Sequence, residues 1–299
     1  MTRPILIPRL CGGLGNQLFI YAAAFRLARF HNARLMLDPA IGFVGDPYRR
    51  RYALDAFRGP AACPKTPRLL RGVGGRLFRR LLLRFGRLPG CHARVETDER
   101  RFDSASMNAP LRGVTYLEGY WQSESYFQDA APALRQALEP AVSPAPPPAG
   151  LASAGAADAA VSLHIRRRWR PNGAPAGPGD RYVTLTVDYY RAALSLVQRE
   201  RPGCRVVVFG DDPDWARATL NLPADTVWAP PDRPAVDDLL LMARCRHHII
   251  ANSSFSWWGA WLGEQPDSLT VAPAAGFVNR DAIPAHWRVL PETGSCAGQ

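Results

Sequence analysis

The 299-residue sequence is almost free of lysine, because Lys65 is the only lysine among 37 basic residues. Such one-sided use of arginine is what the codon bias of a GC-rich genome produces, so the arginine count alone is weak evidence for any ligand. Residues 65–101 hold eleven basic and three acidic residues and account for +8 of the net charge of +11. The charge is therefore local, and no nucleic-acid-binding module is recognisable, which argues against a nucleic-acid partner.

Cysteine and histidine lack the spacing that metal sites need. No two cysteines form a C-x-x-C pair, which fits reduced thiols in a cytosolic protein better than a disulfide framework or a zinc site. His247 and His248 are adjacent, have no suitably spaced partner and would point different ways in regular structure. We therefore expect no metal and no resident cofactor.

Long hydrophobic runs are absent as well. The longest early run, residues 18–25, ends at Arg26 and is far shorter than the roughly 20 residues of a membrane-spanning helix. No targeting segment is visible. These absences predict a cytoplasmic protein.

The chain opens with the pattern of a strand, a glycine-rich loop and a helix. A strand is expected over residues 5–10, and the motif C-G-G-L-G-N-Q then brings Gly13, Gly15 and Asn16 to the start of a helix. Backbone N–H groups in such a loop can bind an anion, although a close-packed turn explains the same glycines. With a second strand over residues 33–37, this pattern predicts an α/β domain.

An aromatic segment and a linker follow. A strand over residues 114–117 leads to Glu118, Tyr120 and Trp121, which could hold a sugar or could be core and rim residues. Residues 140–158 consist mainly of Pro, Ala, Ser and Gly, which predicts a linker. The expected organisation is an amino-terminal α/β domain over 1–139, a linker over 140–158, a carboxyl-terminal α/β domain over 159–290 and a tail over 291–299.

An arginine cluster follows the first buried strand of the second half. The segment V-S-L-H-I-R-R-R-W-R, residues 161–170, carries His164, Arg166 and Arg167 at the end of the strand. Several guanidiniums at the carboxyl end of a parallel strand can hold a diphosphate. In an arginine-rich chain they could equally form a solvated loop.

Two further strands of the second half end in polar residues. The strand over 205–209 precedes Asp211 and Asp212, which could bind a ribose or a base or could cap the next helix. Another short strand precedes a serine-rich helix start that could cradle a phosphate. Its polar residues are Asn252, Ser253, Ser254 and Ser256. The following Trp257, Trp258 and Trp261 are expected in the core.

Residues 72–87 predict a basic amphipathic helix. Its apolar face would consist of Leu77, Phe78, Leu81, Leu82 and Phe85, with the arginines largely off it. Such a helix either packs its apolar face on its own domain or contacts an anionic membrane surface that presents a lipid-linked substrate. Both interpretations stay open.

Four stretches occur together in chain order: G-G-L-G-N-Q-L-F-I-Y-A, E-G-Y-W-Q-S-E-S-Y-F, H-I-R-R and L-M-A-R-C-R-H-H-I-I-A-N-S-S-F-S-W-W-G-A-W-L. As a set they resemble the α-1,2-fucosyltransferases of glycosyltransferase family 11. The resemblance implies a GT-B architecture of two Rossmann-like α/β domains facing a cleft, the first on the acceptor side and the second binding the nucleotide sugar. It also implies GDP-L-fucose as donor, inversion at the anomeric carbon and no required metal.

The resemblance also implies roles for single residues. The family pattern H-x-R-R-x-D matches His164, Arg166 and Arg167, and the arginine is similar to one that grips the donor diphosphate. Asn16 is similar to an asparagine beside the reacting centre. The donor-side matches are Gly13, Gly15, Asp211, Asp212, Asn252, Ser253, Ser254 and Ser256. The sequence departs from the pattern at Trp169, where the family has an aspartate, so a nearby acid such as Asp180 would have to replace it or the activity has changed.

The expected activity is transfer of L-fucose from GDP-L-fucose to the 2-hydroxyl of a galactose-type acceptor, in the synthesis of a surface polysaccharide or oligosaccharide. Candidates for the base are Glu118, Asp46 and Asp180, and Tyr120 and Trp121 are candidates for the acceptor side. The alternative is a catalytically silent protein that binds a GDP-sugar or a carbohydrate on the same fold.

Overall fold

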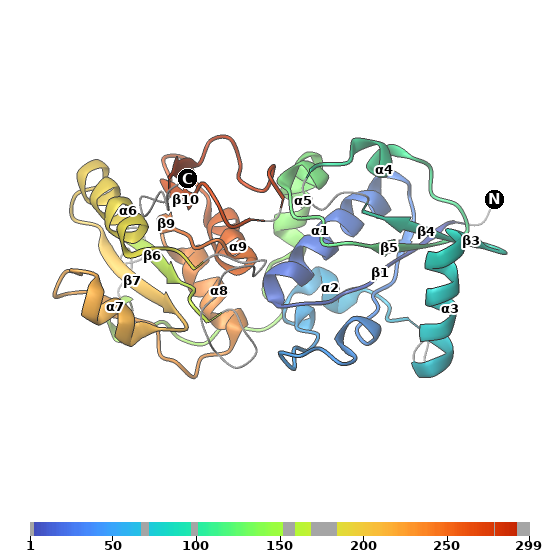
Figure 1. Cartoon of the computed structure of the whole chain (residues 1–299), viewed down its shortest axis with the longest axis horizontal. Coiled ribbons are helices and arrows are strands. Elements are labelled where there is room, and N and C mark those ends of the chain that lie inside the picture. The colour runs from blue at the N-terminus through green and yellow to red at the C-terminus, as the bar shows by residue number, and fades with distance from the viewer. Residues whose placement is uncertain are drawn as a thin grey trace, which may run out of the picture. The chain divides into compact units, whose positions relative to one another are not determined.

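A computed structural model describes residues 3–66, 72–96, 101–151, 159–168, 184–277 and 279–291. The chain divides into two compact units, and each is mixed α/β with a mainly parallel sheet (Figure 1). The first unit is Met1–Ser143 with Val278–Ala282, and the second is Pro144–Phe277 with Ile283–Gln299. The predicted α/β class is confirmed.

The first unit begins with β1 (Ile5–Pro8), α1 (Leu14–Phe30) and β2 (Arg34–Leu35). Two 3-10 turns, η1 (Ile41–Phe43) and η2 (Leu54–Ala56), precede α2 (Arg58–Ala62), α3 (Gly72–Phe85), β3 (Arg87–Leu88) and β4 (Cys91–Val95). Then come α4 (Ser104–Asn108), β5 (Val114–Glu118), the 3-10 turns η4 (Glu124–Tyr126) and η5 (Gln128–Ala130), and α5 (Ala131–Ala137).

The sheet of the first unit has the strand order β2-β1-β5-β4-β3 in the described residues. Its pairs are parallel except for β3 with β4, which are antiparallel. Sequence analysis missed this hairpin because its short strands follow an arginine-rich helix and show no clear alternation. Residues 33–37, predicted as a strand, give only the two-residue strand β2.

The second unit continues the β-α alternation. It contains η6 (Ala149–Leu151), β6 (Ala160–Ile165), α6 (Val187–Glu200), β7 (Arg205–Gly210), α7 (Pro213–Thr219) and β8 (Val227–Trp228). It continues with α8 (Ala235–Arg244), β9 (His247–Ile249), α9 (Ser254–Gly263), β10 (Thr270–Pro273) and β11 (Arg288–Leu290). Its strand order in the described residues is β11-β10-β9-β6-β7-β8, and every pair is parallel.

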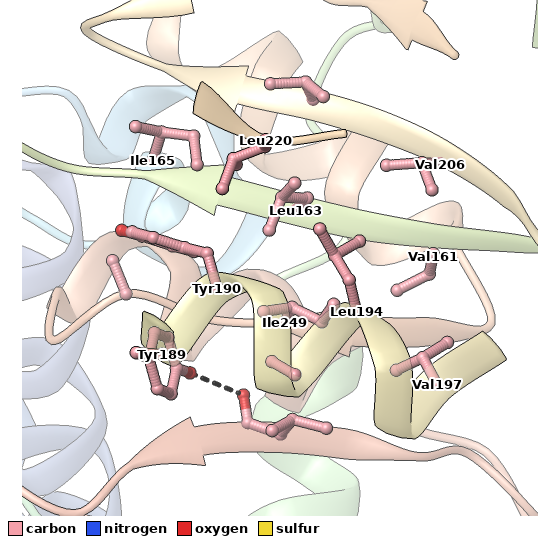
Figure 2. Packing of buried hydrophobic residues seen from close by; sticks show 14 of the residues in the cluster. Val161, Leu163, Ile165, Tyr189, Tyr190, Leu194, Val197, Val206, Leu220 and Ile249 are labelled. Atoms are coloured by element: carbon pink, nitrogen blue, oxygen red, sulfur yellow. Dashed lines mark hydrogen bonds between the residues drawn. The ribbon is translucent and has the colours of Figure 1, made fainter. Parts of the chain in front are cut away.

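The core of the second unit lies where α6 covers the centre of the sheet. Figure 2 shows Leu163 of β6 among side chains of α6 and of the neighbouring strands. The hydroxyl of Tyr189 in α6 donates to the carbonyl oxygen of Ile250 at 2.7 Å and also lies 3.4 Å from that of Val271, so the one polar atom of this buried side chain is satisfied. The helix and the carboxyl end of β9 are thereby fixed to each other.

Strand register places the ends of β6, β7 and β9 at one edge of this sheet. Ile165 pairs with Gly210, and Leu163 pairs with Ile249. Because parallel strands all point the same way, the residues that follow them share the carboxyl edge, where α/β sheets bind ligands. The arginine cluster, the acidic pair and the serine-rich helix start all begin there.

The division into units differs from the predicted domains in two places. Residues 144–151 belong to the second unit, and Leu151 is buried against Ala160, Val207 and Phe209, so the linker predicted over 140–158 is too long. Residues 278–282 return to the first unit, where the backbone carbonyl of Asp281 accepts from the Ser123 hydroxyl at 2.9 Å. Long-range contacts of this kind leave no signal in local composition.

Gly210 provides a test of the sheet edge. Its φ is +139°, and a Cβ there would overlap the backbone carbonyl of Ile165. Gly203 also has a positive φ, +82°, but has open space around it. We expect Gly210→Ala to lower the free energy of unfolding of the second unit by roughly 3 kcal/mol or more and Gly203→Ala by about 1 kcal/mol. Urea unfolding followed by tryptophan fluorescence measures both, and equal losses would contradict the close approach at Gly210.

Candidate functional site

The residues after β6 form an arginine loop, residues 166–168, that is held by Asp211. The Asp211 carboxylate accepts the backbone N–H groups of Arg167 and Arg168 at 2.9 and 3.1 Å. Its Oδ2 also lies 2.9 Å from Nη1 of Arg166. One carboxylate therefore fixes both the loop backbone and one of its guanidiniums.

Arg167 is fixed by a second set of contacts. Its Nε donates to Oδ2 of Asp212 at 3.1 Å, and its guanidinium carbon lies 4.1 Å from the centre of the Trp215 ring. Oδ1 of Asp212 in turn accepts the backbone N–H of Trp215 at 3.4 Å and caps α7. Of the two roles left open for Asp212, the structure shows the helix cap.

The two arginines remain suited to an anionic ligand. Their side chains are 28% and 20% exposed, so they lie at the edge of the sheet and are neither buried nor fully solvated. A guanidinium carries five N–H donors, so a carboxylate that accepts one or two of them fixes the group without excluding a second oxygen-rich ligand. Fixed, partly desolvated guanidiniums are what recognition of a diphosphate requires.

His164 lies inside the sheet rather than at its edge. It is buried in β6, with its ring 5.7 Å from that of Phe255. Burial, together with the nearby Arg166 guanidinium, lowers the pKa of His164 to about 3. The imidazole is therefore neutral near pH 7, and it lies in the strand that leads into the arginine loop.

The start of α9 uses part of its serine-rich sequence for its own structure. The Ser253 hydroxyl accepts the backbone N–H of Phe255 and caps the helix. Ser256 is buried, and its hydroxyl lies within reach of the carbonyl oxygens of Ala251 and Ser253. Ser256 therefore has a structural role, which corrects its assignment as a donor contact, while Asn252 and Ser254 stay candidates. Trp257, Trp258 and Trp261 are buried, as predicted.

In the first unit, the glycine loop (residues 11–15) turns the chain from β1 into α1. Gly12 has a φ of +73°, and Gly13 is the N-cap of α1, which has no side-chain cap. The backbone N–H groups at this helix start therefore lack a side-chain acceptor from the cap residue. The adjacent Asn16 accepts from the side-chain amide of Gln122 at 2.9 Å, which joins the glycine loop to the segment after β5.

Sequence analysis missed Gln17 and Arg50. Gln17 is buried, donates to the carbonyls of Gly12 and Arg51 at 3.0 and 2.9 Å, and accepts the backbone N–H of Ala53 at 3.0 Å. The guanidinium of Arg50 stacks on the ring of Tyr48 at 4.0 Å and lies next to Gly13. The run R-R-R after Tyr48 was the available signal, and the arginine-rich composition obscured it.

The acidic candidates of the first unit are engaged in local contacts. Oε1 of Glu118 accepts from Arg9 at 2.9 Å and from Arg79 at 2.6 Å, and Oε2 accepts from Arg79 at 3.1 Å. Oδ1 of Asp46 accepts the backbone N–H groups of Tyr48 and Arg50 at 2.9 and 3.2 Å. Both carboxylates therefore have structural partners, and a role of either as the base stays a prediction.

The aromatic segment after β5 is shaped by a buried carboxylate. Oε2 of Glu96 accepts the backbone N–H groups of Tyr120 and Trp121 at 2.7 and 3.0 Å. Trp121 is fully buried, has a φ of +55° and packs edge-on against Tyr126. Its assignment to the acceptor side is therefore corrected to a core role, whereas the partly exposed Tyr120 stays a candidate. Asp180 and Trp169 lie outside the described residues.

Comparison with known proteins decides the family. The sequence pattern of "Glycosyl transferase family 11" matches residues 100–283, which is more than half of the chain. This chain belongs to that family. It is 28% identical over 301 residues to the alpha-1,2-colitosyltransferase of Escherichia coli, with 95% of this chain and 98% of the relative covered.

Two other similarities concern a part of the sequence of this family 11 glycosyltransferase and its fold. A stretch of 133 residues is 34% identical to the O-antigen biosynthesis glycosyltransferase WbnK of Escherichia coli and covers 40% of each protein. A substituted form of Arabidopsis thaliana FUT1 in complex with GDP has a TM-score of 0.52 at 11% identity, with 91% of this chain and 70% of FUT1 covered. The family 11 member thus has the fold of GT-B glycosyltransferases.

Neither a metal-binding group nor a membrane-spanning helix is found among the described residues. They contain no group of three or more His, Cys, Asp or Glu side chains arranged to hold a metal ion. Within the same residues, no helix combines the length and the apolar character that crossing a membrane demands. That the reaction requires no metal stays a prediction.

Burial of His164 predicts that the stability of the fold depends on pH. An unfolded histidine takes up a proton near pH 6.5, whereas His164 in the folded chain stays neutral down to about pH 3. Stability therefore falls as the pH is lowered through this window, by about 1.4 kcal/mol per pH unit for one such histidine. We expect His164→Gln to reduce the slope between about pH 6 and 4 by this amount in urea unfolding. A His164 ring proton that titrates near pH 6.5 by NMR would contradict the assignment.

Proposed function

We propose that this family 11 glycosyltransferase transfers L-fucose from GDP-L-fucose to the 2-hydroxyl of a galactose-type acceptor, with inversion at the anomeric carbon. The observation that carries the proposal is the arginine loop at the carboxyl edge of the second sheet. Its two guanidiniums are held in place by Asp211 and Asp212. The similarity to a bacterial α-1,2-colitosyltransferase supports the linkage, and that to WbnK supports a surface polysaccharide as product.

The guanidiniums would act on the charge that develops as GDP departs. Cleavage of the glycosidic bond leaves negative charge on the β-phosphate, while positive charge grows on the sugar ring. Arg166 and Arg167 are already fixed by carboxylates, so they would stabilise the departing diphosphate without reorganising. Backbone N–H groups at the start of α9, beside Asn252 and Ser254, would add further donors.

The acceptor would be held by the first unit. We assign the glycine loop with Asn16, the neighbouring Arg50 and Tyr120 to this role, because they gather near the carboxyl ends of β1 and β5. Glu118 and Asp46 are not assigned as the base, since their oxygens already accept from local donors. Where a lipid carries the acceptor, the enzyme would also have to meet a membrane surface, which is a separate proposal that rests on α3.

A second donor is favoured by one observation. The relative that aligns along nearly the whole chain is a colitosyltransferase, and colitose differs from L-fucose in lacking the 3-hydroxyl. A site that hydrogen-bonds this hydroxyl would reject the deoxy sugar strongly, whereas a site without such a contact would accept both. The donor is therefore the property that the experiment has to decide first.

A donor and acceptor panel tests the proposal. GDP-L-fucose, GDP-colitose and GDP-mannose are each incubated with β-galactosides, and the released GDP and the product linkage are measured. We expect turnover with GDP-L-fucose and an α-1,2 linkage in the product. Turnover with GDP-colitose alone would show that the donor is GDP-colitose and not GDP-L-fucose. Saturable GDP binding without turnover on any pair would support the alternative of a silent binding protein and overturn the proposal.

A pair of arginine substitutions tests the site within the second unit. We expect Arg166→Ala to lower kcat by about 10²–10³-fold, which corresponds to roughly 3–4 kcal/mol of lost transition-state stabilisation. Arg168→Ala is the matched control, because Arg168 is the adjacent arginine but its side chain is exposed. Steady-state kinetics should show less than about a threefold change for the control. Equal losses in both variants, or full activity of Arg166→Ala, would contradict the assignment.

A further inference from the structure

The inner side of α3 packs on the first unit through Phe78, Arg79 and Leu82. Leu82 is fully buried against Ile7 and Tyr116, and the Phe78 ring lies 6.0 Å from that of Tyr116. Arg79 is paired with Glu118 at 2.6 Å. Figure 1 shows α3 beside β3 and β4, the antiparallel hairpin at the edge of the sheet. The helix is therefore firmly held, and its other side faces outward.

That outer side carries a stripe of exposed apolar side chains. Leu77, Leu81 and Phe85 are 55%, 39% and 61% exposed and recur every four residues, so they lie along one face of α3. The sequence pattern places these residues with Phe78 and Leu82 on a single apolar face. The structure splits that face, because Phe78 and Leu82 pack on the sheet while the other three side chains are exposed. Scattered apolar residues at a surface are ordinary, but a contiguous stripe indicates an interaction site.

The charge around the stripe identifies the kind of partner. Arg76, Arg80 and Arg84 are exposed on the same helix, and the exposed Arg87 lies two residues beyond its end. The sequence from residue 72 to residue 95 contains no acidic residue. An apolar stripe flanked by arginines is complementary to a surface with anionic headgroups above an apolar interior.

Other partners fit these features less well. A second copy of the chain docked through the same face would bring the arginines of both copies together at the rim of the interface. Nucleic acid would engage the arginines but leave the leucines and the phenylalanine exposed to water. A bilayer surface accommodates both kinds of side chain at once.

We propose that α3 docks this protein on anionic membrane surfaces, with Leu77, Leu81 and Phe85 inserted at the headgroup level and the arginines against the lipid phosphates. The contact is peripheral, since a single amphipathic stripe supplies reversible binding rather than a membrane span. It would keep the enzyme at a surface where lipid-linked acceptors are carried. This proposal goes beyond the donor and the linkage and does not depend on them.

Vesicle co-sedimentation with the full chain tests the proposal. The probes are vesicles of phosphatidylglycerol with phosphatidylethanolamine, and vesicles of phosphatidylcholine alone, at low and at physiological ionic strength. We expect binding to the anionic vesicles that weakens with salt, and binding at least tenfold weaker to phosphatidylcholine. Background sedimentation with anionic vesicles at low ionic strength would overturn the proposal.

Two variants separate the contributions of the stripe and of the arginines. The change of Leu77, Leu81 and Phe85 to Ser should lower the partition coefficient by more than tenfold. The change of Arg76, Arg80 and Arg84 to Gln should lower it by on the order of 100-fold, because each arginine near such a surface contributes about fivefold. Thermal unfolding and GDP binding in solution should be unchanged in both, which shows that the folded protein is being compared.

Matched controls remove similar groups elsewhere on the surface. One control changes the exposed apolar residues Val44, Val142 and Val289 to Ser, and the other changes the exposed arginines Arg199, Arg244 and Arg280 to Gln. Both should sediment like the wild type within about threefold. Losses equal to those of the α3 variants would overturn the proposal, as would a concentration-dependent dimer that the serine variant of α3 abolishes.

Discussion

The hydrogen bonds of Asp211 to the arginine loop are the constraint on which the candidate site depends. Three donor groups that follow β6 converge on this one carboxylate, namely two backbone N–H groups and the Arg166 guanidinium. Parallel register brings Asp211 there, because β7 ends beside β6 at Gly210, where a side chain would not fit. The same edge receives the start of α9. A fixed pair of guanidiniums at a strand end is the arrangement that a departing diphosphate needs.

Acidic side chains serve as internal counterions in this molecule. In an arginine-rich chain, the carboxylates that look like ligands or bases turn out to hold arginines in place. Asp212 holds Arg167, and Glu118 holds Arg79 together with Arg9. The pair with Arg79 also anchors α3, so one carboxylate at the end of β5 contributes to the surface that we propose meets the membrane.

Sequence reasoning recovered the parts of the molecule that local pattern encodes. The α/β alternation, the strand ends at Arg166 and Asp211 and the buried tryptophans of α9 follow from periodicity and motif. It did not recover features that depend on three-dimensional neighbours. The inward turn of Ser256, the burial of Trp121 and the split of α3 into two apolar sides are decided by packing. Gln17 was missed because a glutamine in a helix carries no signal until its three backbone partners are known.

Calorimetric binding of GDP and GMP to the wild type and to Asp211→Asn tests the central claim most directly. The two nucleotides differ in the β-phosphate, and an asparagine keeps the shape of Asp211 while it loses the charge that orients the arginine loop. We expect the substitution to weaken GDP binding by about tenfold or more, while GMP binding changes by less than about threefold. Equal weakening of both nucleotides, or unchanged GDP binding, would show that Asp211 does not organise a diphosphate site.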